Sequence, residues 1–110
     1  DQEALEYYQK SLDVVPLREL AEVHFKIAEN YQAQGKNSQA MEEYLKVTYL
    51  FPDKKDLQVK AYLRVARLYE DNENLSAAGD IYAKISAMDV PEAKFAQERL
   101  ESIRSQEKAR

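Results

Sequence analysis

The stretch that decides the fold is residues 22–52, EVHFKIAENYQAQGKNSQAMEEYLKVTYLFP, whose apolar spacing predicts two helices joined by a tight turn. A similar pattern returns 38 residues later in residues 60–85, KAYLRVARLYEDNENLSAAGDIYAKI. Two tyrosines and one alanine recur at this offset: Tyr31, Ala40 and Tyr44 return as Tyr69, Ala78 and Tyr82. Self-similarity at a fixed period of this size is typical of helical repeat proteins.

The composition predicts one all-α domain. Of the 110 residues, 45% are apolar and 33% are charged, while 2 glycines and 3 prolines are too few for the many turns of an all-β protein. The absence of cysteine excludes disulfides, thiol catalysis and cysteine-containing zinc sites. The net charge of −4 argues against a nucleic-acid partner. No apolar run approaches the roughly 18 residues that cross a bilayer, so we expect no direct membrane insertion.

Apolar residues at three- to four-residue spacing predict six helices. Their expected ranges are 2–14, 17–34, 38–50, 57–72, 75–88 and 91–107, the last with Pro91 in its first turn. Gly35 is expected to end the second helix because it can adopt positive φ. Asn37 or Ser38 is expected to cap the third helix, and Asp56 the fourth. In the turn 71–74, Asn72 is expected to take the left-handed position.

These residues resemble the pattern of the tetratricopeptide repeat, a pair of antiparallel helices of about 34 residues. The first complete unit matches the family's large, small, aromatic and turn positions with His24, Ile27, Ala28, Tyr31, Gly35, Ala40, Tyr44, Val47 and Pro52. The second unit matches them with Tyr62, Val65, Ala66, Tyr69, Ala78, Tyr82 and Ile85. It departs at Glu73, where glycine is usual, and at Pro91, which comes one residue late.

The resemblance implies a single domain over residues 1–110, an all-α right-handed α-solenoid of about six helices in antiparallel pairs. Its expected parts are the second helix of a partial repeat at 1–16, repeats at 17–52 and 56–90, and a C-terminal capping helix at 91–107. The extended Phe-Pro-Asp connection at 51–53 resembles a bacterial subgroup that includes the periplasmic TolA-binding protein and envelope-assembly lipoproteins. That likeness would place the protein in the bacterial periplasm or cell envelope, with the cytoplasm left open. Because the chain begins at Asp1, we read it as an excised or processed fragment.

Most of the recurrent residues are expected to be structural. Alanines at the small positions let paired helices approach closely. Tyrosines fill the space between successive pairs, with their hydroxyls reaching outward to a partner or to water. His24, the one histidine, is expected to pack, because a catalytic or metal role needs partners that the sequence lacks. The carboxylate pairs Glu42/Glu43 and Asp71/Glu73 are read as solvated surface. We therefore expect no catalytic, metal or cofactor-binding residues.

In this family the first helix of each pair lines a concave groove that binds partners. The matching positions, which the resemblance makes candidate partner-binding residues, are Phe25, Lys26, Glu29, Lys60, Leu63, Arg64 and Arg67, with Glu22, Gln32 and Glu70 on the same faces. The basic strip of Lys60, Arg64 and Arg67 suits an acidic peptide or a free C-terminal carboxylate. The alternative is that these residues form ordinary surface ion pairs worth little.

We therefore expect a non-catalytic protein–protein interaction or scaffold module that binds a peptide or partner protein and acts in bacterial envelope assembly. The alternative is a structural self-association segment of a larger repeat protein, in which the partly uncovered stripe of the first helix joins a second copy in a homo-oligomer. That stripe comprises Leu5, Tyr8, Leu12 and Val15. A third possibility is an enzyme, but the sequence offers no candidate set of catalytic residues. Tyr7 and Tyr49 lie off the repeat pattern, and either a partner contact or packing fits them.

Overall fold

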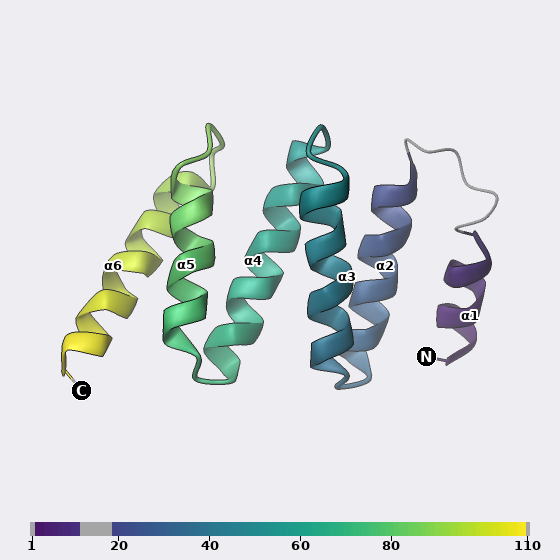
Figure 1. Cartoon of the computed structure of the whole chain (residues 1–110), viewed down its shortest axis with the longest axis horizontal. Coiled ribbons are helices and arrows are strands. Elements are labelled where there is room, and N and C mark those ends of the chain that lie inside the picture. Colours follow the sequence, from purple (N-terminus) through teal and green to yellow (C-terminus); the bar gives the residue numbers. More distant parts are fainter. Residues whose placement is uncertain (1, 12–18, 110) are drawn as a thin grey trace. The chain divides into compact units, whose positions relative to one another are not determined.

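Six helices follow one another along the part of the chain that the structure describes, and no strand occurs there. This computed structural model describes residues 2–11 and 19–109, with side chains for 2–6 and 19–109. The helices are α1 (Gln2–Ser11), α2 (Leu20–Ala33), α3 (Asn37–Leu50), α4 (Lys55–Asp71), α5 (Leu75–Ser86) and α6 (Ala93–Ala109), as Figure 1 shows. The all-α helical repeat fold predicted from the sequence is confirmed. Residues 12–16 of the predicted first segment, and the predicted start of the second helix, lie outside the described residues.

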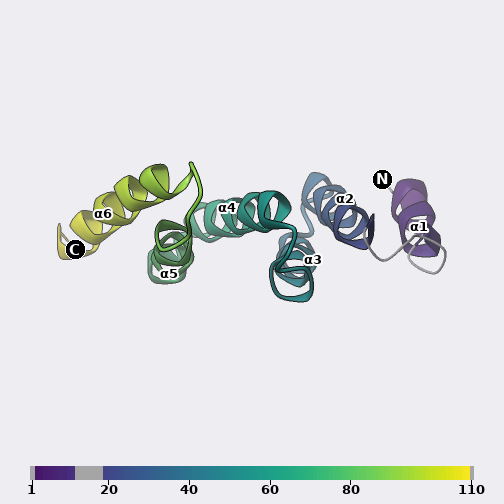
Figure 2. The same cartoon turned by 90° about the horizontal axis from the view of Figure 1, so that it is seen from above.

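Two compact units make up the chain, residues 1–61 and residues 62–110, and their division falls inside α4. In the first unit α1 packs on α2 and α2 packs on α3, whereas in the second α5 packs on α6. Figure 1 shows the chain reversing direction between α2 and α3 and again between α5 and α6, and Figure 2 shows the same pairs from above. Figure 1 also shows α4 and α5 running in opposite directions. The first hairpin is therefore α2 with α3, and the second hairpin is the part of α4 in the second unit with α5, on which α6 packs.

Small side chains bring α2 and α3 together in the first unit. Ala28 and Ala40 are fully buried, as the repeat pattern predicts, and so are Tyr44 and Val47. Phe25 packs beside them, with its ring centroid 5.2 Å from that of Tyr44 and an interplanar angle of 66°. This edge-on geometry is one that aromatic pairs prefer. The hairpin interior thus combines alanine contacts with aromatic filling.

Leu5 of α1 is also part of this core. Only 2% of its surface is exposed, because α1 packs on α2. The expectation that the stripe of the first helix is partly uncovered is therefore wrong at Leu5. Tyr8, Leu12 and Val15 lie outside the residues whose side chains are described.

In the second unit, α6 sits closely on α5. Ala78 is fully buried, and Gly79 beside it presents bare backbone to α6. A Cβ atom added at Gly79 would lie 3.5 Å from Leu100 Cδ1 and 3.7 Å from Ile103 Cγ2. Leu100 and Ile103 are themselves buried, so the inner face of α6 completes this core.

The turn after α2 has the hydrogen bonds of a Schellman motif. The Lys36 amide donates to the Tyr31 carbonyl at 2.9 Å, and the Gly35 amide donates to the Gln32 carbonyl at 3.0 Å. Gly35 has φ 76°, the left-handed conformation that this motif requires. The prediction that Gly35 ends this helix is confirmed.

The turn after α4 repeats this motif without a glycine. The Asn74 amide donates to the Tyr69 carbonyl at 2.8 Å, and the Glu73 amide donates to the Glu70 carbonyl at 2.9 Å. The left-handed residue is Glu73, with φ 60°, so the prediction of Asn72 is wrong. The reason is register: the motif fixes its fifth residue in the left-handed region, and the 38-residue offset makes Glu73 the counterpart of Gly35.

The second helices of the two hairpins start differently. The Asn74 side chain caps α5 by accepting a hydrogen bond from the Ala77 amide at 3.2 Å. Lys36 holds the equivalent position before α3 with a similar backbone (φ −87°, ψ 70° against φ −90°, ψ 74°), but it makes no side-chain cap bond. The prediction that Asn37 or Ser38 caps α3 is wrong, because the helix begins one residue early and takes both into its first turn.

Two other predicted boundaries need correction. Helix α4 begins at Lys55, so Asp56 lies in the first turn instead of at the N-cap, where its charge still favours the positive end of the helix dipole. Helix α6 begins at Ala93, so Pro91 precedes the helix. The Glu92 carbonyl accepts the amide of Ala96 and so starts the helical hydrogen bonding.

Replacing Glu73 by glycine should raise the free energy of unfolding by about 1 kcal/mol, because a Cβ atom costs about 1–2 kcal/mol in the left-handed conformation. Urea denaturation followed by circular dichroism measures the change. The matched control is Gly35→Ala, which should lower the stability by a similar amount. An added Cβ there meets no atom within 4 Å, so the loss reports backbone strain alone. A Glu73→Gly variant no more stable than wild type would contradict this account of the turn.

Replacing Lys36 by asparagine should stabilise the chain by about 1 kcal/mol, because the backbone already has the capping conformation and lacks only the acceptor. The converse change, Asn74→Lys, should cost about the same by removing the cap from α5. Thermal and urea unfolding of the two variants check the pair. Shifts of the same sign in both would show that the cap does not decide the outcome.

Candidate partner-binding surface

The exposed side of α4 carries the basic strip predicted from the sequence. Lys60, Arg64 and Arg67 follow at intervals of four and three residues, which places them on one side of a helix. All three are exposed, and Leu63 is half-buried. Arg67 Nε lies 3.6 Å from Asp71 Oδ1, but the two side chains are 73% and 60% exposed. An ion pair this exposed contributes little to folding stability, and it leaves the Arg67 guanidinium accessible to a ligand.

The candidates on α2 have a different environment. Phe25 retains only 7% exposure because its ring packs against α3, so it belongs to the hairpin core and its expected place on a partner-facing surface is revised. Lys26 is exposed, and its Nζ lies 3.5 Å from Glu29 Oε1 one turn along. Helix α2 therefore carries one exposed lysine, paired with Glu29, whereas α4 carries three exposed cations, of which Arg67 is paired with Asp71.

A polar cluster joins α2 to α3. His24 Nδ1 lies 2.8 Å from Glu43 Oε1, and Lys46 Nζ donates to Glu43 Oε2 at 2.7 Å. Burial disfavours the ionised carboxylate, but hydrogen bonds from His24 and Lys46 outweigh it and hold the pKa of Glu43 below its usual value. His24 also packs near Phe51, with ring centroids 5.9 Å apart. The prediction that Glu43 is solvated surface is wrong, because this contact from α2 covers it, while Glu42 is exposed as expected.

Each hairpin contains a tyrosine whose hydroxyl donates to a side chain 12 residues earlier. Tyr44 donates to Gln32 Oε1 at 2.7 Å, and Tyr82 donates to Glu70 Oε2 at 2.5 Å. The sequence predicted that these hydroxyls reach a partner or water, and the structure shows a partner for both: a side chain of the preceding helix. A buried hydroxyl needs such an acceptor. Gln32 and Glu70, assigned to the groove faces from the sequence, are these acceptors. Their equal separation from the recurrent tyrosines is the signal that could have paired them.

Arg99 of α6 joins the second of these contacts. Its Nη2 donates to Glu70 Oε1, so one carboxylate accepts hydrogen bonds from α5 and α6. Burial, and then the hydrogen bond to Glu70, raise the pKa of Tyr82 to about 12. The hydrogen bond to Glu70 also raises the pKa of Arg99. The sequence pattern did not identify Arg99, since its partner lies 29 residues away on another helix.

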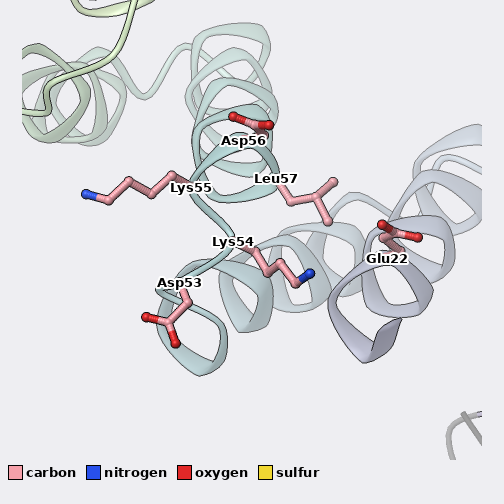
Figure 3. Close-up of a pocket in the computed structure, with 6 residues that line it drawn as sticks. All are labelled: Glu22, Asp53, Lys54, Lys55, Asp56 and Leu57. Carbon is pink, nitrogen blue, oxygen red and sulfur yellow. The ribbon is translucent and has the colours of Figure 1, made fainter. Parts of the chain in front are cut away.

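An open hollow of about 340 Å³ lies in the first unit, between the start of α2 and the connection from α3 to α4 (Figure 3). Its lining residues are Glu22, Asp53, Lys54, Lys55, Asp56 and Leu57. Figure 3 shows Lys54 and Leu57 extending toward Glu22, whereas Lys55 points away. Among the residues with described placement, no group of three His, Cys, Asp or Glu side chains could hold a metal ion. The hollow is thus lined by both acidic and basic side chains, and its described residues do not form a metal-binding group.

Large apolar side chains stand exposed at two places in the described part of the chain. Tyr49 and Leu50 adjoin at the end of α3, and Phe95 lies in the first turn of α6. The Phe95 ring is edge-on to Tyr82, with centroids 6.3 Å apart. Of the two interpretations left open for Tyr49, its 64% exposure favours a contact surface over packing, while the side chain of Tyr7 lies outside the described residues. No helix within 2–11 and 19–109 is long and apolar enough to cross a membrane.

The phenol of Tyr82 should ionise later than an ordinary tyrosine. Its pKa rises from 10.0 to about 12, so the protonated phenol stabilises the fold; this contribution is complete below pH 10 and is lost between pH 10 and 12. The ultraviolet difference titration between wild type and Tyr82→Phe should have its midpoint near 12. The steep loss of stability between pH 10 and 12 should weaken in the variant. A midpoint near 10.0 with the helical signal intact would contradict the buried contact with Glu70.

Comparison with known proteins bears on the first hairpin. Residues 21–54 match the family model described as tetratricopeptide repeat, and this range covers most of α2, all of α3 and the connection to α4. No curated protein and no solved structure matches the chain significantly. Tetratricopeptide repeats generally mediate protein–protein interaction or scaffolding and are typically non-catalytic. Residues 21–54 are therefore similar to a tetratricopeptide repeat, and the described residues of the chain have an all-α helical repeat fold that agrees with this match.

Proposed function

We propose that the chain is a non-catalytic protein–protein interaction module that binds an acidic peptide, or an acidic segment of a partner protein, on the exposed face of α4. The similarity of residues 21–54 to a tetratricopeptide repeat is the observation that carries the interaction role. The strip of Lys60, Arg64 and Arg67 supports the ligand class, because guanidinium groups bind carboxylates bidentately. The setting we propose is the bacterial cell envelope, on the resemblance of the Phe-Pro-Asp connection at 51–53.

The surroundings of the α4 strip favour it over the other candidates. Arg67 pairs with Asp71 across open surface, and replacing such a partner by a ligand carboxylate costs about 0.2–1 kcal/mol. Leu63, half-buried on the same helix, adds apolar surface for a ligand. On α2, by contrast, Phe25 is in the core and Gln32 accepts the Tyr44 hydroxyl.

Peptide display against the immobilised chain should enrich acidic sequences, and a synthetic peptide of the enriched class should bind in fluorescence anisotropy. Reversing Lys60, Arg64 and Arg67 together to Glu should weaken that binding about tenfold or more, because three attractions become repulsions. The helical circular dichroism should stay the same, since all three side chains are exposed.

A matched variant separates this face from net charge. It reverses three exposed basic residues of α6, Lys94, Arg104 and Lys108, and so makes the same change in net charge. Its affinity for the peptide should stay within about threefold of wild type, because these residues lie on another helix than the proposed binding face and salt weakens the attraction between exposed charges that are not in contact. If the two variants weaken peptide binding equally, the proposal that the peptide binds specifically to α4 is contradicted. A failure to enrich any ligand, together with a dimer in light scattering, would favour self-association instead.

A further inference from the structure

The two hairpins make the same tyrosine contact with different acceptors. Tyr44 donates to the neutral amide of Gln32, and Tyr82 donates to the carboxylate of Glu70. Gln32 and Glu70 are equivalent, since each lies 12 residues before its tyrosine. The tyrosine needs only an acceptor, and Gln32 shows that an amide suffices. The negative charge of Glu70 is therefore not needed for the hydrogen bond with Tyr82 and must have another role.

Arg99 is the described residue that uses this charge. Its guanidinium donates to the second oxygen of Glu70, and the two side chains are 33% and 15% exposed. A hydrogen bond between ionised groups is roughly twice as strong as one between neutral groups. Partial burial also shields it from salt, unlike the open Arg67–Asp71 pair on the same helix α4.

The buried apolar contacts of α6 do not define its position so sharply. Leu100 and Ile103 lie against the bare backbone at Gly79 through apolar surface. Hydrophobic contact is non-directional, so such a surface tolerates a helix that is rotated or shifted. A single buried polar contact can specify register where apolar contacts leave it open.

We propose that Glu70 is a stacking-selectivity residue, which holds α6 in one register on the second hairpin and accepts there only a helix that presents a cation, here Arg99. The carboxylate keeps the structural task of its counterpart Gln32, which is to accept a tyrosine hydroxyl. It adds recognition of the next helix. Glu70 acts through the placement of α6, so it is a positioning residue.

Hydrogen exchange of the full chain, measured by mass spectrometry with helix-level resolution, tests this assignment. Glu70→Gln restores the residue of the first hairpin and keeps an acceptor for Tyr82, while Arg99→Gln removes the cation. Each should accelerate exchange of the α6 amides about tenfold, because opening of α6 loses a charge-assisted hydrogen bond. Exchange in α2 and α3 should stay within about twofold of wild type. The double variant should exchange no faster than the faster single, since the two residues act as a unit.

Two further variants complete the experiment. Arg67→Gln removes the exposed pair from the same helix and should leave α6 exchange within about twofold of wild type. Arg99→Lys keeps the charge and should recover most of the protection that Arg99→Gln loses. Unchanged α6 exchange in Glu70→Gln, equal acceleration in every helix, or single effects that multiply in the double variant would each overturn the proposal.

Discussion

The close approach of the paired helices is the constraint on which the rest of the structure depends. Fully buried alanines hold the small positions of both hairpins: Ala28 and Ala40 in the first, Ala66 and Ala78 in the second. A larger side chain at any of these positions would press on its surroundings, and overpacking of that kind costs about 1–3 kcal/mol. Once the alanines set the spacing, a large ring such as Tyr44 can fill the volume beside them without a void.

That packing creates the polar contacts of the core. A tyrosine buried between two helices brings its hydroxyl with it, and a buried hydroxyl without a partner costs about 1–3 kcal/mol. In a hairpin of this geometry, the side chain 12 residues earlier lies within reach, so Gln32 serves Tyr44 and Glu70 serves Tyr82. These acceptors lie on helices that also carry the candidate partner-facing residues. Position on the first helix of a repeat therefore does not by itself make a residue available to a ligand.

The helices and the core could be predicted from the sequence, because apolar periodicity and the repeat offset report burial directly. The exposure of Lys60, Arg64 and Arg67 followed from the same spacing. The turns could not be predicted from residue preference, since Asn72 suits a left-handed conformation better than Glu73 does, yet the Schellman register selects Glu73.

Side-chain contacts between helices were the second feature that the sequence could not predict. The burial of Phe25 and the pairing of Glu43 with His24 depend on how one helix faces the next. The Glu70–Arg99 contact depends on a third helix. The spacing of residues along one helix carries no information about distances between side chains on different helices. The charge pattern alone therefore predicted that Glu43 faces solvent. Pairing equivalent positions across the repeat would have recovered the tyrosine contacts, but not the contact of Arg99, which has no counterpart among the recurrent residues.

Equivalent positions share a backbone environment, so a residue change between them reports a change in what the position must do. At Gly35 and Glu73 the environment is the same Schellman turn, and the Glu73 side chain is exposed. The Glu73 side chain therefore leaves the turn strained without gaining a partner among the described residues. At Gln32 and Glu70 the shared demand is an acceptor for tyrosine, and the added charge coincides with a new contact from α6. The first difference weakens a turn, whereas the second extends the hairpin to the next helix. The recurrent residues thus build the fold, and the differences between the hairpins carry its specificity.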